Sequence, residues 1–105
     1  MLEHKQIFNL LNTLNIPVAY DHFDNDKTLQ PPFIAYRETS PDLFNADDIV
    51  YFRPYTFEIE LVTSKKDVAL EKRIEGLLTQ NNIPYTIDNE VWDEDEKIYH
   101  NFYNI

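Results

Sequence analysis

The apolar positions at the start of the chain recur at helical spacing and predict a helix over residues 2–15. The residues that share its apolar face are Leu2, Ile7, Leu10, Leu11 and Leu14. Asn15 suits the left-handed cap conformation and Pro17 cannot continue a helix, so the helix is expected to end between them.

A second helix is predicted over residues 68–81, with Asp67 as its N-cap and an apolar stripe of Leu70, Ile74, Leu77 and Leu78. Gly76 is the only glycine, and inside a helix it costs about 1 kcal/mol against alanine. It either admits a close contact or is simply tolerated. Two leucines, three intervening residues and then Asn-Ile-Pro occur at residues 10–17 and again at 77–84. We interpret this echo as shared cap chemistry in preference to an internal duplication.

Five segments are predicted to be strands: residues 18–23, 33–38, 49–62, 83–87 and 98–105. In the longest, one face carries Tyr51, Tyr55, Phe57, Ile59 and Leu61, and the other carries Thr56, Glu58 and Glu60. This alternation indicates a sheet that is buried on one side. Pro54 interrupts the run and indicates an edge position or a bulge.

These elements predict an α+β fold in one domain, residues 1–105, with an N-terminal helix, a mainly antiparallel sheet of about five strands and a second helix packed on one face. The apolar fraction of 43% and the seven Phe, seven Tyr and one Trp favour a folded chain despite the net charge of −10. Nineteen acids against nine bases disfavour sequence-specific nucleic-acid binding and anionic membranes.

Cysteine is absent, which excludes disulfides, thiolate zinc sites and cysteine nucleophiles and fits a reducing compartment. No apolar run approaches the roughly 20 residues of a membrane span. The first residues lack the basic start and apolar stretch of a signal peptide, so we expect a cytosolic protein.

The residues that could carry chemistry are scattered. His4, His22 and His100 show no metal-ligand spacing, and we interpret them as isolated surface or sheet histidines. The acidic stretches at 21–26 and 88–96 offer hard oxygens without the glycine or spacing of an EF-hand, so solvated loops are favoured over a weak cation site. No glycine-rich phosphate loop or Gly-x-Ser-x-Gly elbow occurs. We therefore predict no catalytic residues, no metal and no cofactor, and a protein that is not an enzyme.

Trp92 is the only tryptophan and lies within residues 88–96, which hold six acids. An aromatic side chain amid charge can anchor a protein contact, or it can be a core residue whose neighbours face solvent. We favour the core interpretation slightly.

Four segments resemble, in order and with similar spacing, a family of small prophage proteins of Gram-positive bacteria: residues 16–23, 31–36, 44–48 with 50–51, and 58–67 with 69–71. The resemblance covers nearly the whole chain, and the family looks like the tail terminators, or tail completion proteins, of long non-contractile phage tails, or their relatives in the head–tail neck. Two positions depart from the pattern: Asn15 stands where glycine is common, and Val68 stands where proline often follows the Asp. Both are at helix boundaries and leave the implied role intact.

The resemblance implies a protein that assembles as a hexameric ring in the host cytoplasm, caps the finished tail tube, and joins it to the head connector in the virion neck. It brings no catalytic motif to transfer. The residues that we predict to make protein contacts are Asp47, Asp48, Tyr51, Tyr55, Trp92, Asp93 and Glu94. An acidic DNA mimic that blocks a nucleic-acid-binding enzyme is the alternative, although Lys65, Lys66, Lys72, Arg73 and Lys97 break the acidic pattern.

Overall fold

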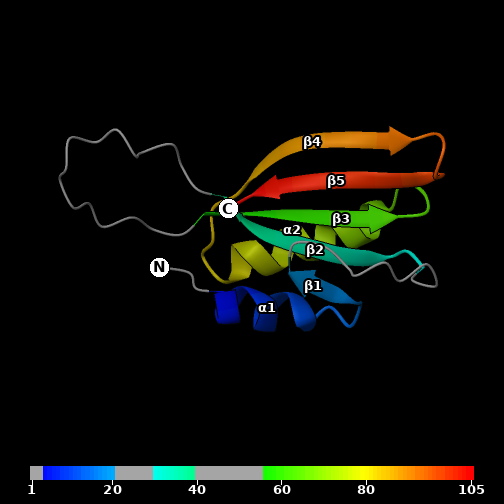
Figure 1. Cartoon of the computed structure of the whole chain (residues 1–105). Helices are drawn as coiled ribbons and strands as arrows, with labels where there is room; N and C mark the ends of the chain where they lie inside the picture. The colour runs from blue at the N-terminus through cyan, green and yellow to red at the C-terminus, as the bar shows by residue number, and fades with distance from the viewer. Residues whose placement is uncertain (1–3, 21–29, 40–55) are drawn as a thin grey trace, which may run out of the picture.

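The computed structural model describes residues 4–20, 30–39 and 56–105. Its elements are α1 (His4–Asn12), β1 (Val18–Tyr20), β2 (Phe33–Thr39), β3 (Thr56–Thr63), α2 (Val68–Gln80), β4 (Thr86–Asp93) and β5 (Ile98–Asn104). The strands form one sheet in the order β1-β2-β3-β5-β4, in which only β1 and β2 are parallel (Figure 1). The predicted α+β fold with a mainly antiparallel five-stranded sheet is confirmed.

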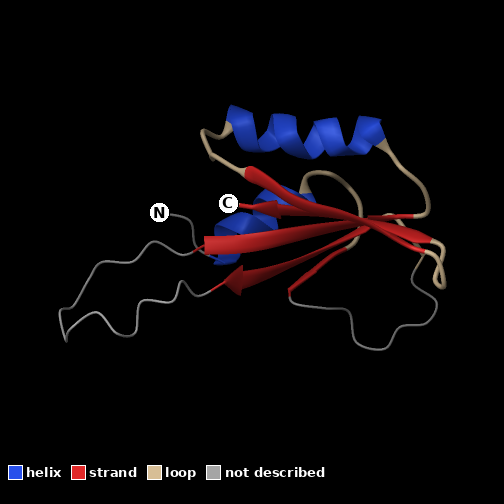
Figure 2. Ribbon diagram, turned by 90° about the horizontal axis from the view of Figure 1, so that it is seen from above, coloured by secondary structure: helices blue, strands red, loops and turns tan. Residues whose placement is uncertain are grey.

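Both helices pack on the same face of the sheet. From β3 that face presents Phe57, Ile59 and Leu61, which are all fully buried. The same core contains Ile7 and Leu11 from α1, Leu14 from the turn after it, and Leu70, Ile74 and Leu78 from α2. No described helix lies on the opposite face, and Figure 2 shows α2 as a layer to one side of the strands. The predicted one-sided burial of the central strand is therefore correct.

The caps of α2 follow from its sequence. The Asp67 side chain accepts a hydrogen bond from the Leu70 N–H at 3.0 Å, as predicted for the N-cap. At the other end Asn82 has φ 58°, and the Ile83 N–H donates to the Leu78 carbonyl at 2.9 Å. Asn15, after α1, has φ 61°. Both ends of the sequence echo thus use an asparagine in the left-handed conformation, which agrees with the cap interpretation.

Several predicted boundaries move. The helix expected over residues 2–15 is described from His4 and ends at Asn12, because the N–H groups of Thr13 and Leu14 bond to carbonyls three residues back and tighten the last turn. The first and third predicted strands are described only as β1 and β3. Residues 21–23 and 49–55, with Pro54, lie outside the described residues.

The largest correction concerns the acidic stretch, which was predicted to be a loop after a strand at 83–87. Instead β4 begins at Thr86 and continues to Asp93, so most of the stretch is a strand, paired antiparallel with β5. Strand pairing is compatible with the charges because β4 is at the edge of the sheet, where acidic side chains stay in water. No helix among the described residues is long and apolar enough to cross a membrane.

Candidate interaction site

The edge strand β4 extends beyond the helical layer. Ile87 and Trp92 point to the same side of the sheet as the helices but remain 61% and 42% exposed, and Val91 on the other side is 39% exposed. In Figure 1, β4 and β5 run above the level of α2. Exposed apolar area that is rimmed by polar residues is typical of contact sites, and the three apolar side chains of β4 lie among its exposed acids. We call β4, β5 and the turn between them the hairpin.

Local chemistry explains the hairpin turn. The Asp93 side chain accepts hydrogen bonds from the N–H groups of Asp95 and Glu96, at 3.0 and 3.1 Å, and the Asp93 carbonyl accepts from Lys97 N–H at 2.8 Å. Lys97 takes a positive φ of 59°, which is uncommon for lysine. Because neither Gly nor Asn marks this position, the sequence gives no strong turn signal.

The outer edge of β4 is partly closed to another strand. The register shifts between Ile87 and Asn89, and the Glu90 N–H is satisfied by the Asn89 side chain at 2.8 Å. Irregularity of this kind and charged side chains both discourage pairing at a sheet edge. A partner would therefore contact the side chains of the hairpin rather than extend the sheet.

A shallow hollow of about 460 Å³ lies beside the turn. Its lining residues are Glu60, Val91, Trp92, Asp93, Glu94, His100 and Phe102. The His100 and Phe102 rings stack at 6.1 Å with 9° between their planes. The Trp92 indole donates to a Glu94 carboxylate oxygen at 2.6 Å and packs near the Tyr99 ring. The hollow thus joins aromatic walls to an acidic rim, a mixture suited to protein contacts.

Residues 64–80 and the hairpin expose side chains of opposite charge. All four cations of residues 64–80 are exposed, namely Lys65, Lys66, Lys72 and Arg73, whereas Glu71 is buried and Glu75 is only 14% exposed. The outer side of α2 is consequently basic. In the hairpin, Asp88, Glu90, Glu94, Asp95 and Glu96 are all exposed. An acidic surface and a basic surface therefore coexist on a chain of net charge −10.

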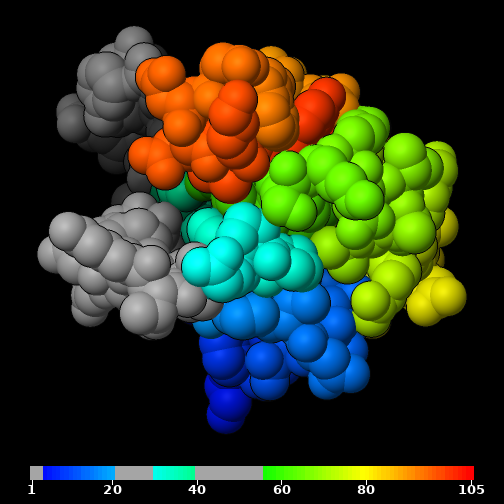
Figure 3. Space-filling view, turned by 90° about the vertical axis from the view of Figure 1, so that its right-hand side faces the viewer, coloured from blue at the N-terminus to red at the C-terminus, as the bar shows by residue number. Residues whose placement is uncertain are grey.

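Lys66 ties these two regions together. Its ammonium bonds to Glu71 of α2 at 3.0 Å and to Glu90 of β4, and lies 5.5 Å from the centre of the Tyr99 ring. The hydrogen bond to Glu90, followed by that to Glu71, raises the pKa of Lys66, and the same bond to Lys66 lowers the pKa of Glu90. Figure 3 views the molecule from the side that bears the β4–β5 turn, and there the hairpin adjoins the connection from β3 to α2.

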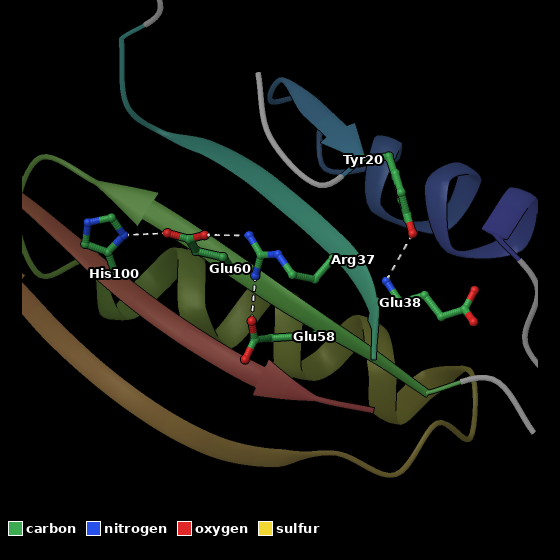
Figure 4. Close-up of polar contacts among 6 residues, drawn as sticks. All are labelled: Tyr20, Arg37, Glu38, Glu58, Glu60 and His100. Atoms are coloured by element: carbon green, nitrogen blue, oxygen red, sulfur yellow. Dashed lines mark hydrogen bonds and ion pairs between the residues drawn. The ribbon is translucent and has the colours of Figure 1, made fainter. Parts of the chain in front are cut away.

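The sheet face without helices carries a polar ladder (Figure 4). Arg37 donates to Glu58 at 2.5 Å and to Glu60 at 3.0 Å, and the other oxygen of Glu60 lies 2.5 Å from His100 Nδ1. Burial lowers the pKa of Arg37, but its hydrogen bonds to the two carboxylates outweigh this, and the pKa is raised. The ladder follows the register, because Arg37 pairs with Glu58, and Phe102, the neighbour of His100 on the same face, pairs with Glu60.

Further polar groups lie between α2 and the sheet. Tyr103 donates to Glu75 at 3.0 Å, and its pKa is raised first by burial and then by that hydrogen bond. Within the part of the chain that the structure describes, the buried polar side-chain atoms without a hydrogen bond are Thr63 Oγ1, Glu71 Oε2 and Asn101 Nδ2. Among residues 4–20, 30–39 and 56–105, no group of three or more His, Cys, Asp or Glu residues could hold a metal ion.

The structure brings some of the predicted contact residues together and does not describe the others. Trp92, Asp93 and Glu94 come together at the hairpin turn, whereas Asp47, Asp48, Tyr51 and Tyr55 lie outside the described residues. The core interpretation of Trp92 is wrong, because this side chain is 42% exposed. His4 and His100 each bond to one carboxylate, Glu38 and Glu60 respectively, and His22 is outside the described residues.

Sequence reasoning missed Ile87, Val91 and Lys66 as surface features. Ile87 and Val91 were missed because the acidic residues around them led to the prediction of a loop. Ile87 and Val91 are β-branched and Trp92 is aromatic, and these residue types could have indicated a strand. No sequence signal places Lys66 against Glu90, because 24 residues separate them.

The sequence matches no protein-family model. A search of curated proteins likewise finds no match.

Proposed function

We propose that this protein is a structural part of a phage tail, a tail terminator or completion protein that caps the tail tube and joins it to the head connector. The observation that carries the proposal is the hairpin, which presents Ile87, Val91 and Trp92 on an edge strand outside the helical layer. A small domain that exposes apolar side chains in this way is suited to assembly. The sequence resemblance supplies the identity of the assembly.

The distribution of titratable groups also supports a role in assembly over a role in catalysis. In the described residues, four acids that are buried or partly buried are paired with cations or tyrosine: Glu58 and Glu60 with Arg37, Glu71 with Lys66, and Glu75 with Tyr103. Groups held in this way maintain a fold, because removing one partner would leave the other charge buried without compensation. The hollow beside the turn is shallow and open, unlike the enclosed pockets that most small-molecule enzymes use.

The DNA-mimic alternative has weaker support. A mimic spreads unpaired acids over a continuous surface, whereas here Arg37 and Lys66 neutralise acids on both sides of the sheet and the outer side of α2 is basic. Competition with DNA for a restriction enzyme or polymerase, followed by gel shift, distinguishes the two. Displacement of DNA by this protein would favour the mimic.

Negative-stain microscopy tests the proposal directly. The purified protein is mixed with tail tubes of the phage that encodes it, and we expect density at tube ends and arrest of tube growth when the protein is added to assembling tube subunits. Val91→Ser is expected to weaken this effect, because it removes an exposed apolar side chain of the hairpin. Phe8→Ser is the matched control, since Phe8 on α1 is equally exposed at 39%. Bare tube ends and unaltered growth with the wild-type protein would contradict the proposal.

A further inference from the structure

Two described surfaces complement each other in charge, and each includes an exposed apolar side chain. The first is the tip of the hairpin, residues 91–97, with Val91 and Trp92 beside exposed Glu94, Asp95 and Glu96. The second, which we call the α2 outer face, consists of Lys65, Val68 and Lys72. Val68 is 53% exposed, and Lys72 is one helical turn after it on the same side of α2.

The charges of both surfaces remain available to a partner. Lys72 is 74% exposed and has only a distant pairing with Glu75 at 3.6 Å, and Lys65 is exposed. At the tip, Glu94 pairs with Lys97 at 3.3 Å, but both side chains are more than 70% exposed. Exposed pairs of this kind contribute at most about 1 kcal/mol and exchange readily for better partners.

We propose that the hairpin tip of one copy of this chain docks on the α2 outer face of a second copy. Acidic side chains of the tip would meet Lys65 and Lys72, and Trp92, on the helix side of β4, would cover Val68. Complementary charge selects the partner and its orientation, while the apolar side chains provide burial at the centre of the contact.

The net charge of −10 does not prevent this contact. At physiological ionic strength the screening length is about 8 Å, so facing patches interact more strongly than the distant remainder of two acidic molecules. The partly closed edge of β4 also directs the contact away from strand addition, because the Glu90 N–H is already bonded to Asn89.

The position of the two surfaces determines what kind of assembly results. α2 forms the layer behind the sheet, whereas the tip lies at one end of β4 and β5 (Figures 1 and 2). In the arrangement we propose, the tip of each copy engages the α2 outer face of the next copy and the two copies do not exchange tips. Such a contact is heterologous, so it continues from copy to copy and gives a ring when the rotation closes. This contact would join the subunits of the assembly proposed above. Only its role in the tail rests on the proposed function.

Sedimentation velocity of the full chain over a range of concentrations tests the inference. The wild-type protein is expected to form species larger than a dimer, and these should dissociate as salt is raised. The α2-reversed variant, Lys65→Glu with Lys72→Glu, and the tip-reversed variant, Glu94→Lys with Glu96→Lys, should each weaken self-association at least about tenfold, because like charges then face each other. Lys5→Glu, an exposed lysine on α1, is the control and should behave as wild type.

An equimolar mixture of the two reversed variants should recover the large species, since each reversed surface then meets an opposite charge. Circular dichroism of each variant shows whether it has folded. A wild-type protein that stays monomeric, reversed variants that associate like wild type, or association that stops at a dimer would each overturn the inference. Binding to tube ends is measured separately. If the protein caps tubes but both reversed variants associate like wild type, the proposed function holds and this contact is wrong. If the protein forms rings that depend on both surfaces but do not bind tubes, the contact holds and the proposed function is wrong.

Discussion

The helix α2 and the hairpin have similar proportions of apolar and charged residues but use them in opposite ways. α2 directs Leu70, Ile74 and Leu78 into the core and keeps its cations outside. The hairpin strand β4 leaves Ile87, Val91 and Trp92 exposed together with its acids. The difference arises from position, because α2 lies against the middle of the sheet and β4 lies at its edge. One region therefore stabilises the fold, and the other is free for contacts.

The same substitution in α2 and in β4 tests this difference most directly. Ile74 is fully buried and Ile87 is 61% exposed. Ile74→Ala should lower the free energy of unfolding by about 2–5 kcal/mol, because it removes buried methyl groups and leaves a cavity. Ile87→Ala should cost about 1 kcal/mol or less, the range of strand propensity at an edge. Urea denaturation measures both, and equal losses would show that the hairpin belongs to the core.

The open face of the sheet gives an intermediate case. Arg37→Ala should lower the free energy of unfolding by about 1–3 kcal/mol, because it leaves Glu58 and Glu60 close together, partly buried and without their cation. Arg37→Lys is the control: it keeps the charge but cannot bond to both carboxylates with a planar fork, so it should recover part of the loss. If Arg37→Ala is as stable as wild type, the ladder is a solvated surface feature.

How far the sequence predicts this molecule depends on how local each signal is. Asp67, Asn15 and Asn82 were readable because a cap depends on residues within one turn. The alternation of Phe57, Ile59 and Leu61 predicted the buried face of β3 for the same reason. The extent of β4 was not readable, because acidic residues are typical of loops and only pairing with β5 makes them a strand.

The candidate site was predictable only in part. The exposure of Trp92 depends on where α2 lies over the sheet, which no pattern within residues 88–96 contains. The basic outer side of α2 likewise depends on Glu71 and Glu75 turning inward toward Lys66 and Tyr103. Such features come from tertiary packing between segments distant in sequence.

Gly76 tests whether the α2 outer side is open, as the comparison requires. A Cβ added at Gly76 would meet no atom within 4 Å, so the glycine is tolerated and does not admit a close contact within the chain. Gly76→Ala should therefore raise the free energy of unfolding by about 1 kcal/mol, the difference in helix propensity. Thermal and urea denaturation measure the gain. A loss of stability would mean that another part of the chain packs there.

The smallest expected effect concerns the link between the two regions. Lys66 lowers the pKa of Glu90 below its ordinary value of 4.5, so in the folded protein Glu90 loses its proton more readily than in the unfolded chain. The stabilisation is therefore complete above about pH 4.5 and is lost as pH falls through the lower, folded pKa. Glu90→Gln should be slightly less stable than wild type at pH 7, and the difference should shrink in strongly acidic solution. Urea denaturation across this pH range measures it.

Lys66→Gln provides the control for this effect. In that background Glu90→Gln should no longer change the pH dependence, because the ion pair is already absent and the two substitutions act on one interaction. A difference that persists without Lys66 would assign the effect to Tyr99, which also hydrogen-bonds to Glu90. In that case Glu90 would be stabilised by Tyr99 of the neighbouring strand β5, and α2 and the hairpin would be joined only through the sheet.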